Sequence, residues 1–165
     1  WLESDAEVVS YMDVDLSTGL DAFPLLVRAI VEEGHHLAFG SRLVTGSHVS
    51  RSIKREFISR GYNLIIRLGM GTHFQDAQCG FKALSNAAAR AIVPHIVDNN
   101  WFFDTELLVI AEKKGFRYKE IPVVWEEDQD TRVRVIDTAL EDLRGLARLR
   151  LGGLPDVRVP CETRS

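Results

Sequence analysis

The stretch from Glu7 to Asp15 constrains the fold of this chain more than any other. Its first residues are apolar and favour a β-strand that is buried on both faces. The run ends in two carboxylates one residue apart, Asp13 and Asp15, and a helical pattern begins after the polar residues that follow. In an open α/β sheet, ligands bind beyond the carboxyl ends of the strands. The sequence therefore predicts an α/β fold with a functional site at these two aspartates.

Two carboxylates this close repel each other, and a divalent cation with oxygen ligands would hold them together. Mg²⁺ is usually bound by one or two carboxylates together with substrate phosphates. One interpretation of Asp13 and Asp15 is therefore a site for a metal ion and a phosphate. The alternative is that the Asp-x-Asp sequence opens a turn and caps the next helix, since aspartate is common at both positions.

The remaining chain alternates between short apolar runs and helical periodicity. Helices are expected over residues 21–33, 51–69, 86–91, 104–114 and 133–150, and further strands over 37–39, 81–84 and 118–125. This alternation favours a mostly parallel sheet flanked by helices. Pro122 has no backbone donor and indicates an edge strand or a strand start. Residues 1–150 are expected to form one folded unit, and 151–165 a flexible tail.

Charge is distributed unevenly along the chain. The net charge of −4 gives no reason to expect nucleic acid as a partner, but residues 1–40 carry a net −7 and residues 41–70 a net +5. An acidic site followed by a basic segment suits phosphate-bearing substrates. The basic amphipathic helices expected at 51–69 and 133–150 could lie on an anionic membrane surface, or could be ordinary solvated helices.

Five short motifs occur in an order that resembles family-2 glycosyltransferases of the dolichyl-phosphate mannose synthase and polyprenyl-phosphate glucosyltransferase type. The motifs are Asp13–Asp15, Gly40–Arg42, Gln75–Lys82, Phe103–Leu107 and Ile121–Trp125. The resemblance covers roughly residues 7–150. It implies a GT-A fold and the inverting transfer of a hexose from GDP-mannose or UDP-glucose to a polyprenyl or dolichyl phosphate. It also implies a cytoplasmic enzyme, peripheral to the cytoplasmic face of the membrane.

The resemblance assigns roles to single residues. Asp13 and Asp15 would hold Mg²⁺ or Mn²⁺ against the sugar diphosphate, and Arg42 would lie near phosphates. Without the resemblance, Arg42 could equally be a plain surface arginine. Asp76 matches an acidic position that has been proposed as a base. The other substrate-binding positions that it implies are Arg55, Gln78, Lys82 and Arg132.

We doubt that Asp76 is an essential general base, because a phosphate monoester is already largely ionised at neutral pH. Our hypothesis is that Asp76 orients Lys82, Arg55 or the acceptor.

The chain also departs from the family pattern, because the strand–helix stretch that carries the nucleotide-base motif is absent. We therefore expect residues 1–150 to be the C-terminal part of a catalytic domain.

Two alternatives remain. A haloacid-dehalogenase-type phosphatase also places Asp-x-Asp after a buried strand, although Ser17 stands where that class needs threonine. The chain could also be a truncated fragment without activity that binds a membrane or a partner.

Overall fold

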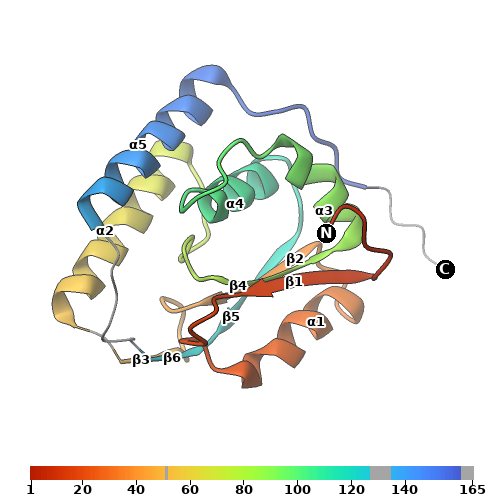
Figure 1. Ribbon diagram of the computed structural model, residues 1–165, viewed down its shortest axis with the longest axis horizontal. Coiled ribbons are helices and arrows are strands. Elements are labelled where there is room, and N and C mark those ends of the chain that lie inside the picture. Colours follow the sequence, from red (N-terminus) through yellow and green to blue (C-terminus); the bar gives the residue numbers. More distant parts are fainter. Residues whose placement is uncertain (51, 127–134, 161–165) are drawn as a thin grey trace.

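The computed structural model describes residues 1–50, 52–126 and 135–160 (Figure 1). The helices are α1 (Phe23–Val31), α2 (Ile53–Met70), α3 (Asn86–Ile92), α4 (Phe103–Lys113) and α5 (Val135–Gly152), with short 3₁₀ helices η1 (Leu20–Ala22) and η2 (Val93–His95). The strands are β1 (Val8–Met12), β2 (Leu37–Ser41), β3 (His48–Ser50), β4 (Phe81–Ser85), β5 (Tyr118–Pro122) and β6 (Val124–Glu126).

The main sheet has the strand order β1-β4-β2-β5. β2 and β5 are parallel, whereas β4 runs antiparallel to both of its neighbours. The α/β class is confirmed, but the sheet is mixed and not mostly parallel. The reason lies in the loop before β4, which ends at the carboxyl edge of the sheet: Phe81 pairs with Met12, the last residue of β1. A strand that enters from that edge can only run back against its neighbours.

Apolar side chains cover both faces of the sheet. Leu37 and Phe39 point to the larger core cluster with α2, α3, α4 and α5, whereas Ala38 between them joins the smaller cluster with α1. This alternation is the ordinary period of a strand. Figure 1 shows the same layers, with α1 on one side of the sheet and the other helices on the opposite side.

Local sequence signals explain several helix ends. The Ser52 and Ser85 side chains accept hydrogen bonds from backbone N–H groups three residues later and so cap α2 and α3. Gly71 follows α2 with φ of 63°, a left-handed conformation that glycine adopts without steric strain. The expected helices are therefore present, with their ends displaced by a few residues.

Three further features differ from the sequence-based expectations or extend them. β3 lies between the strand expected at 37–39 and the helix expected at 51–69, where the sequence analysis predicts no strand, and it pairs in parallel with β6. The strand expected over 118–125 is divided into β5 and β6, and β5 with Pro122 is an edge strand as expected. In the segment 151–165, expected to be a flexible tail, Val157 is buried in the larger core cluster. In the described ranges, none of the helices has the length and apolar character needed to cross a bilayer.

Candidate active site

Asp13 and Asp15 lie directly after β1, at the carboxyl edge of the sheet. The Asp13 N–H donates to the Gly80 carbonyl at 2.8 Å, and Asp15 Oδ1 accepts from the Ser17 N–H at 3.0 Å. Leu16, which follows Asp15, has φ of 52°, which is strained for a residue with a side chain. The turn therefore fixes the backbone of both aspartates while their side chains remain exposed.

The Asp13 carboxylate sits directly over Gly80. A Cβ atom added to Gly80 would come within 2.1 Å of Asp13 Oδ1, so only glycine permits this approach. Partial burial and the nearby Asp15 raise the pKa of Asp13, whereas Lys82 and Arg42 act in the opposite direction. The two cationic side chains therefore lie close enough to act on Asp13, and the predicted site residues gather at one edge.

Arg42 and Asp76 form a buried ion pair beside these aspartates. Arg42 Nε and Nη2 donate to Asp76 Oδ2 and Oδ1 at 2.7 and 2.8 Å, and the Arg42 backbone N–H donates to Oδ2 at 2.9 Å. Asp76 has no exposed side-chain surface. Burial alone would raise its pKa, but the Arg42 guanidinium holds the pKa below its usual range. Asp76 therefore orients Arg42, a partner that the sequence-based hypothesis did not name.

Trp125 on β6 completes the support of Arg42. The guanidinium carbon lies 5.5 Å from the centre of a Trp125 ring, within the range of a cation–π contact. β6 is held in turn by the loop after the aspartates, because the Gly19 N–H donates to the Val124 carbonyl at 2.9 Å. Sequence reasoning placed Trp125 in a motif without a role, since its contact with Arg42 depends on the β3–β6 pairing.

Lys82 lies under the loop that carries Asp76. Its Nζ donates to the carbonyls of Ala77 and Cys79 at 3.2 and 2.5 Å and lies 3.0 Å from Asp104 Oδ1. Lys82 is only 1% exposed. The residue predicted to bind substrate is thus buried and holds the loop in place. Burial lowers the pKa of Lys82 to about 8 and raises that of Asp104 to about 8.

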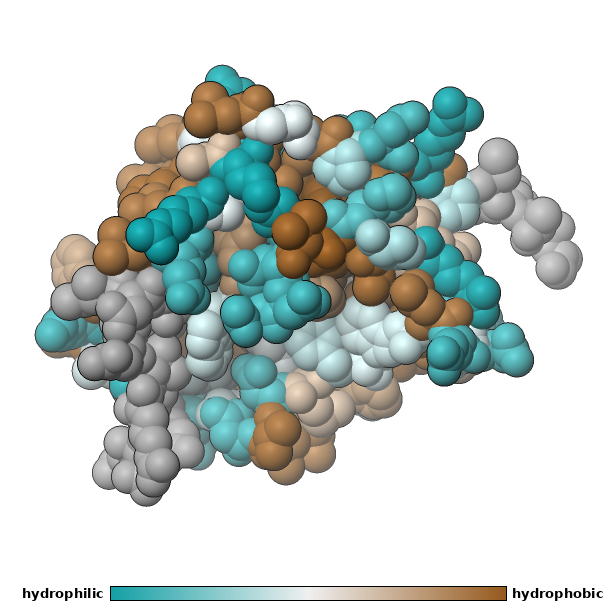
Figure 2. Space-filling view, turned by 45° about the horizontal axis from the view of Figure 1, so that its top comes forward, coloured by the Kyte–Doolittle hydropathy of each residue, from teal (hydrophilic) through white to brown (hydrophobic). Residues whose placement is uncertain are grey.

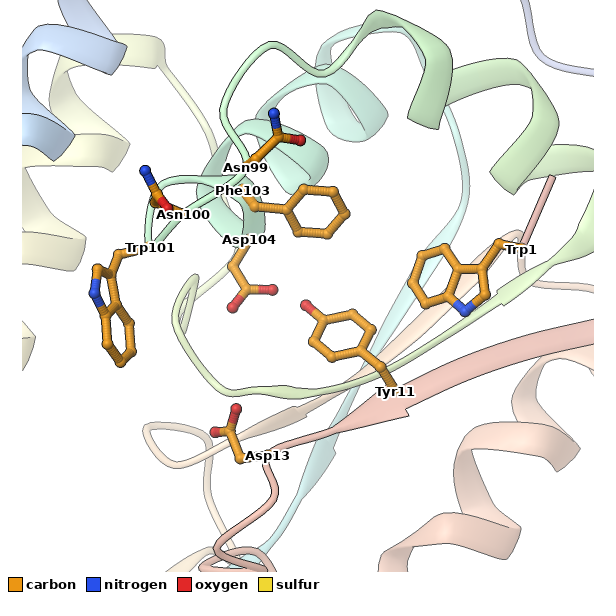
Figure 3. A pocket seen from close by; sticks show the side chains of 8 residues that line it. All are labelled: Trp1, Tyr11, Asp13, Asn99, Asn100, Trp101, Phe103 and Asp104. Carbon is orange, nitrogen blue, oxygen red and sulfur yellow. The ribbon is translucent and has the colours of Figure 1, made fainter.

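A cleft of about 520 Å³ opens next to Asp13. Figure 3 shows the Asp13 and Asp104 carboxylates and the Tyr11 hydroxyl directed toward one another across it. Asn99, Asn100 and aromatic rings complete the lining. Asp104 lies in the first turn of α4, in a motif noted only for its resemblance. Its place beside Asp13 follows from how α4 packs on the sheet, and no local signal in the sequence indicates it.

Gln78 faces α5. Its side-chain amide donates to Asp142 Oδ2 on α5 at 2.9 Å. An ion pair of 2.8 Å between Arg148 on α5 and Glu106 on α4 also holds α5 in place. Burial raises the pKa of Asp142 to about 6. The nearby Asp98 and Glu141 also raise this pKa, whereas hydrogen bonds with Tyr62 and Gln78 lower it. Gln78, predicted to bind substrate, thus anchors the site loop to α5.

The two remaining predicted residues are basic. Arg55 lies half-buried in the first turn of α2. Arg132 lies outside the described residues. The structure therefore brings together Asp13, Arg42, Asp76 and Lys82, while Arg55 remains a prediction.

The donor set fits a hard divalent cation only with help from a ligand. No group of three or more histidine, cysteine, aspartate or glutamate side chains that could hold a metal ion occurs in residues 1–50, 52–126 and 135–160. Asp13 and Asp15 supply two carboxylates with oxygen donors only. This composition suits Mg²⁺ or Mn²⁺, which complete their coordination with water and substrate phosphates.

Comparisons with known proteins agree with this chemistry. No protein-family model matches the chain. It is 39% identical over 130 residues to "Glycosyltransferase AglD" of Haloferax volcanii, an alignment of 79% of this chain and 21% of that protein. It is 33% identical to "Dolichyl-phosphate beta-glucosyltransferase ALG5C" of Trichomonas vaginalis over 81% of this chain and 42% of the relative. The chain thus spans less than half the length of these curated relatives.

The fold is shared with a solved glycosyltransferase. Glucosyl-3-phosphoglycerate synthase of Mycobacterium tuberculosis superposes with a TM-score of 0.60 at 16% identity, over 93% of this chain and 52% of that protein. Its structure with Mn²⁺ and UDP-glucose gives a TM-score of 0.58. Since the chain covers about half of this neighbour, it is an incomplete GT-A domain.

Proposed function

Because the chain belongs to the family-2 glycosyltransferases of the dolichyl- and polyprenyl-phosphate type, we propose that the whole protein transfers a hexose from a nucleotide sugar to a polyprenyl phosphate. The observation that supports this most directly is the Arg42–Asp76 pair beside Asp13. It presents a fixed guanidinium and exposed carboxylates at one edge of the sheet, as a sugar diphosphate requires.

Asp13 and Asp15 would hold the divalent metal, Mg²⁺ or Mn²⁺. When bound, the metal would act as a Lewis acid toward the diphosphate leaving group. The Mn²⁺ and UDP-glucose in the structural neighbour support the choice of a divalent metal and a nucleotide-sugar donor. UDP-glucose is the donor that we test first, with GDP-mannose as the alternative.

Arg42 would stabilise phosphate charge without rearrangement. Nε and Nη2 are bound to Asp76, and among the described residues Nη1 makes no hydrogen bond. Nη1 is therefore the donor available for a phosphate oxygen of the donor or the acceptor. Preorganised donors of this kind are effective because they need no reorientation as charge develops.

Asp76 would act by positioning. Both of its carboxylate oxygens accept hydrogen bonds from Arg42, and the side chain has no exposed surface. A base must reach the proton that it removes. The acceptor phosphate also needs little deprotonation at neutral pH.

The acceptor would reach the site from a membrane surface. α2 and α5 lie side by side (Figure 1), and four apolar residues on one face of α2 are exposed: Ile53, Phe57, Leu64 and Leu68. Figure 2 shows hydrophobic residues gathered over this part of the surface, interleaved with hydrophilic ones. Basic residues beside an apolar stripe suit anionic lipid. On this basis we propose that the protein lies at a membrane surface, and the family resemblance implies the cytoplasmic face.

Sugar transfer is tested with the full-length protein, polyprenyl phosphate, Mn²⁺ and either UDP-glucose or GDP-mannose. We expect labelled hexose in the lipid fraction, and its loss in Asp15→Asn. Asp5→Asn is the matched control, because Asp5 is fully exposed at the opposite end of β1. No transfer from either donor, or unchanged transfer in Asp15→Asn, would contradict the proposal. A trapped aspartyl phosphate would support the phosphatase alternative. Thermal stabilisation by the donor and Mn²⁺ would exclude the other alternative, a fragment that only binds a membrane or a partner.

Membrane contact is tested with vesicles of phosphatidylserine and phosphatidylcholine. We expect binding to phosphatidylserine that weakens with salt and with Phe57→Ser. Leu25→Ser is the control, since Leu25 is 46% exposed on α1, across the sheet. Equal binding by the two variants, or binding that salt leaves unchanged, would count against the membrane surface.

A further inference from the structure

The loop of residues 72–80 carries Asp76 and is held in place largely by single side chains. Four of its backbone N–H groups donate to side chains on three other elements: His73 and Phe74 to Glu112 on α4, Gln75 to Glu120 on β5, and Ala77 to Asn63 on α2. In proteins, most hydrogen bonds of backbone groups go to other backbone groups. The position of this loop therefore depends on a few individual side chains.

Two of these side chains bind the loop immediately beside Asp76. Glu120 Oε1 accepts from the Gln75 N–H at 2.9 Å, directly before Asp76 in the chain. Asn63 Oδ1 accepts from the Ala77 N–H at 2.8 Å, directly after it. The backbone around Asp76 is thus bonded on one side to the sheet, through β5, and on the other side to the helix α2.

The Asn63 side chain is fixed in the orientation that this bond needs. Its Nδ2 donates to the Ser59 carbonyl, one turn earlier in α2, at 2.9 Å, so that Oδ1 faces the loop. Asn63 is only 3% exposed, and Ala77 is fully buried. Removing the Asn63 oxygen would therefore leave a buried N–H group without its partner, and such a group is costly to leave unpaired.

The orientation of Arg42 depends on where this loop lies. Both carboxylate oxygens of Asp76 accept from the Arg42 side chain, and Oδ2 also accepts from the Arg42 backbone N–H. A shift of the loop would move both oxygens and would turn or release the guanidinium. Since functional groups must be held within about 0.5 Å of their productive geometry, a small shift is sufficient to affect a site.

We propose that Asn63 and Glu120 are positioning residues for sugar transfer: they fix the loop on the two sides of Asp76 and thereby set the orientation of Arg42. This inference rests on the proposed function, in which Arg42 stabilises phosphate charge. Other residues line the cleft beside Asp13, so Asn63 and Glu120 act through Asp76 and not by contact with the donor. Their loss should lower kcat and kcat/KM together, because the affected interaction strengthens as charge develops.

The test measures hexose transfer to polyprenyl phosphate by the full-length protein with Mn²⁺ and UDP-glucose or GDP-mannose. We expect Asn63→Ala to lower kcat about tenfold, the order of effect of one buried hydrogen bond. In the Asp76→Asn background the same change should lower kcat less than about twofold, since the two residues act in one chain of contacts. The control is Asn86→Ala, because Asn86 also binds a backbone carbonyl, that of Ser4 at 2.8 Å, but lies at the other end of β4. It should leave kcat unchanged.

A conservative change at Glu120 gives a second test, which decides if Asn63→Ala does not fold. Glu120→Gln keeps an acceptor oxygen for the Gln75 N–H and should retain most of the transfer activity, whereas Glu120→Leu removes the acceptor and should lower kcat about tenfold.

Equal activity of Glu120→Gln and Glu120→Leu would overturn the inference. Unchanged kcat in Asn63→Ala would overturn it too, as would the same loss from Asn63→Ala in both backgrounds. Wild type that transfers hexose from neither donor would instead refute the proposed function itself, so the two failures are distinct.

Discussion

Replacing Asp76 by asparagine is expected to destabilise the protein by leaving a buried guanidinium unpaired. Asp76 accepts three hydrogen bonds from Arg42, at 2.7, 2.8 and 2.9 Å. Asparagine keeps one acceptor oxygen but turns an N–H₂ group toward a donor. The volume of the side chain is almost unchanged, so the variant tests charge and hydrogen bonding and not packing.

The magnitude follows from the burial of the two partners. Removing one partner of a buried ion pair costs about 3–5 kcal/mol, because the other charge is left uncompensated. The Asp76 side chain is fully buried, whereas the Arg42 side chain is 12% exposed and can gain some hydration. We therefore expect Asp76→Asn to lower the free energy of unfolding by about 3 kcal/mol, at the lower end of that range.

The assay is urea unfolding of wild type, Asp76→Asn, Arg42→Met and the double variant. Each single change leaves one buried side chain without its partner. The double variant leaves no unpaired charge at this place. The double variant should thus lose much less stability than the two single losses together, with a coupling of about 2–3 kcal/mol. Additive single effects, within about 0.5 kcal/mol, would refute the conclusion that these two side chains act as a pair.

The same variant separates positioning from base catalysis in the full-length enzyme. If Asp76 positions Arg42, transfer by Asp76→Asn should be reduced at every pH. A loss as complete as that of Asp15→Asn, and relieved by raising the pH, would instead indicate a general base. The pKa of Asp76 is lowered, so the pair should stabilise the fold above the ordinary aspartate pKa and lose that effect as the pH falls below it.

Three further changes test other contacts. Gly80→Ala should displace the Asp13 carboxylate, because Oδ1 would lie 2.1 Å from the new Cβ. We expect weaker Mn²⁺-dependent donor binding by calorimetry, with an almost unchanged melting temperature. Unchanged donor binding would contradict the role of Asp13. Gly145→Ala places a Cβ 2.4 Å from the buried Phe102 ring. The cost of overpacking, about 1–3 kcal/mol, should outweigh the gain in helix propensity of up to about 1 kcal/mol, so the variant should be less stable on urea unfolding. A rise in stability would show that Phe102 can move. Burial raises the pKa of Asp142 to about 6, so its contribution to stability is largest below the ordinary aspartate pKa and is lost as the pH rises toward 6. Asp142→Asn should therefore gain stability relative to wild type between pH 4 and 7. If the free energies of unfolding of the two proteins change with pH in parallel, this prediction is wrong.

Much of the local structure could be predicted from the sequence. The apolar periodicity located the five α-helices that the described part of the chain contains. Ser85 caps the helix that follows it and Gly71 ends the helix before it, so both signals are local. The position of Asp13 and Asp15 at the end of a strand could also be predicted, because strand and turn signals are local. The expectation that this strand is buried on both faces was wrong, because β1 is an edge strand in which only Val9 is buried. These features need no knowledge of which segments become neighbours.

The chemistry of the site required contacts between distant segments. Asp76 lies 34 positions after Arg42, and nothing near either residue indicates that they pair. Lys82 and Gln78 resemble substrate-binding residues in their motif, yet Lys82 is buried under the loop and Gln78 binds α5. The role of a side chain here depends on which atoms surround it after folding.

The sequence by itself determined the helices, the strand that ends in two aspartates and the family resemblance. Only the tertiary structure decided that β4 enters the sheet between β1 and β2, that Trp125 supports Arg42, and that Asp104 faces Asp13 across a cleft. The physical reason is range: turns, caps and periodicity depend on neighbours a few residues away, whereas strand order and side-chain pairing depend on the packing of the whole core.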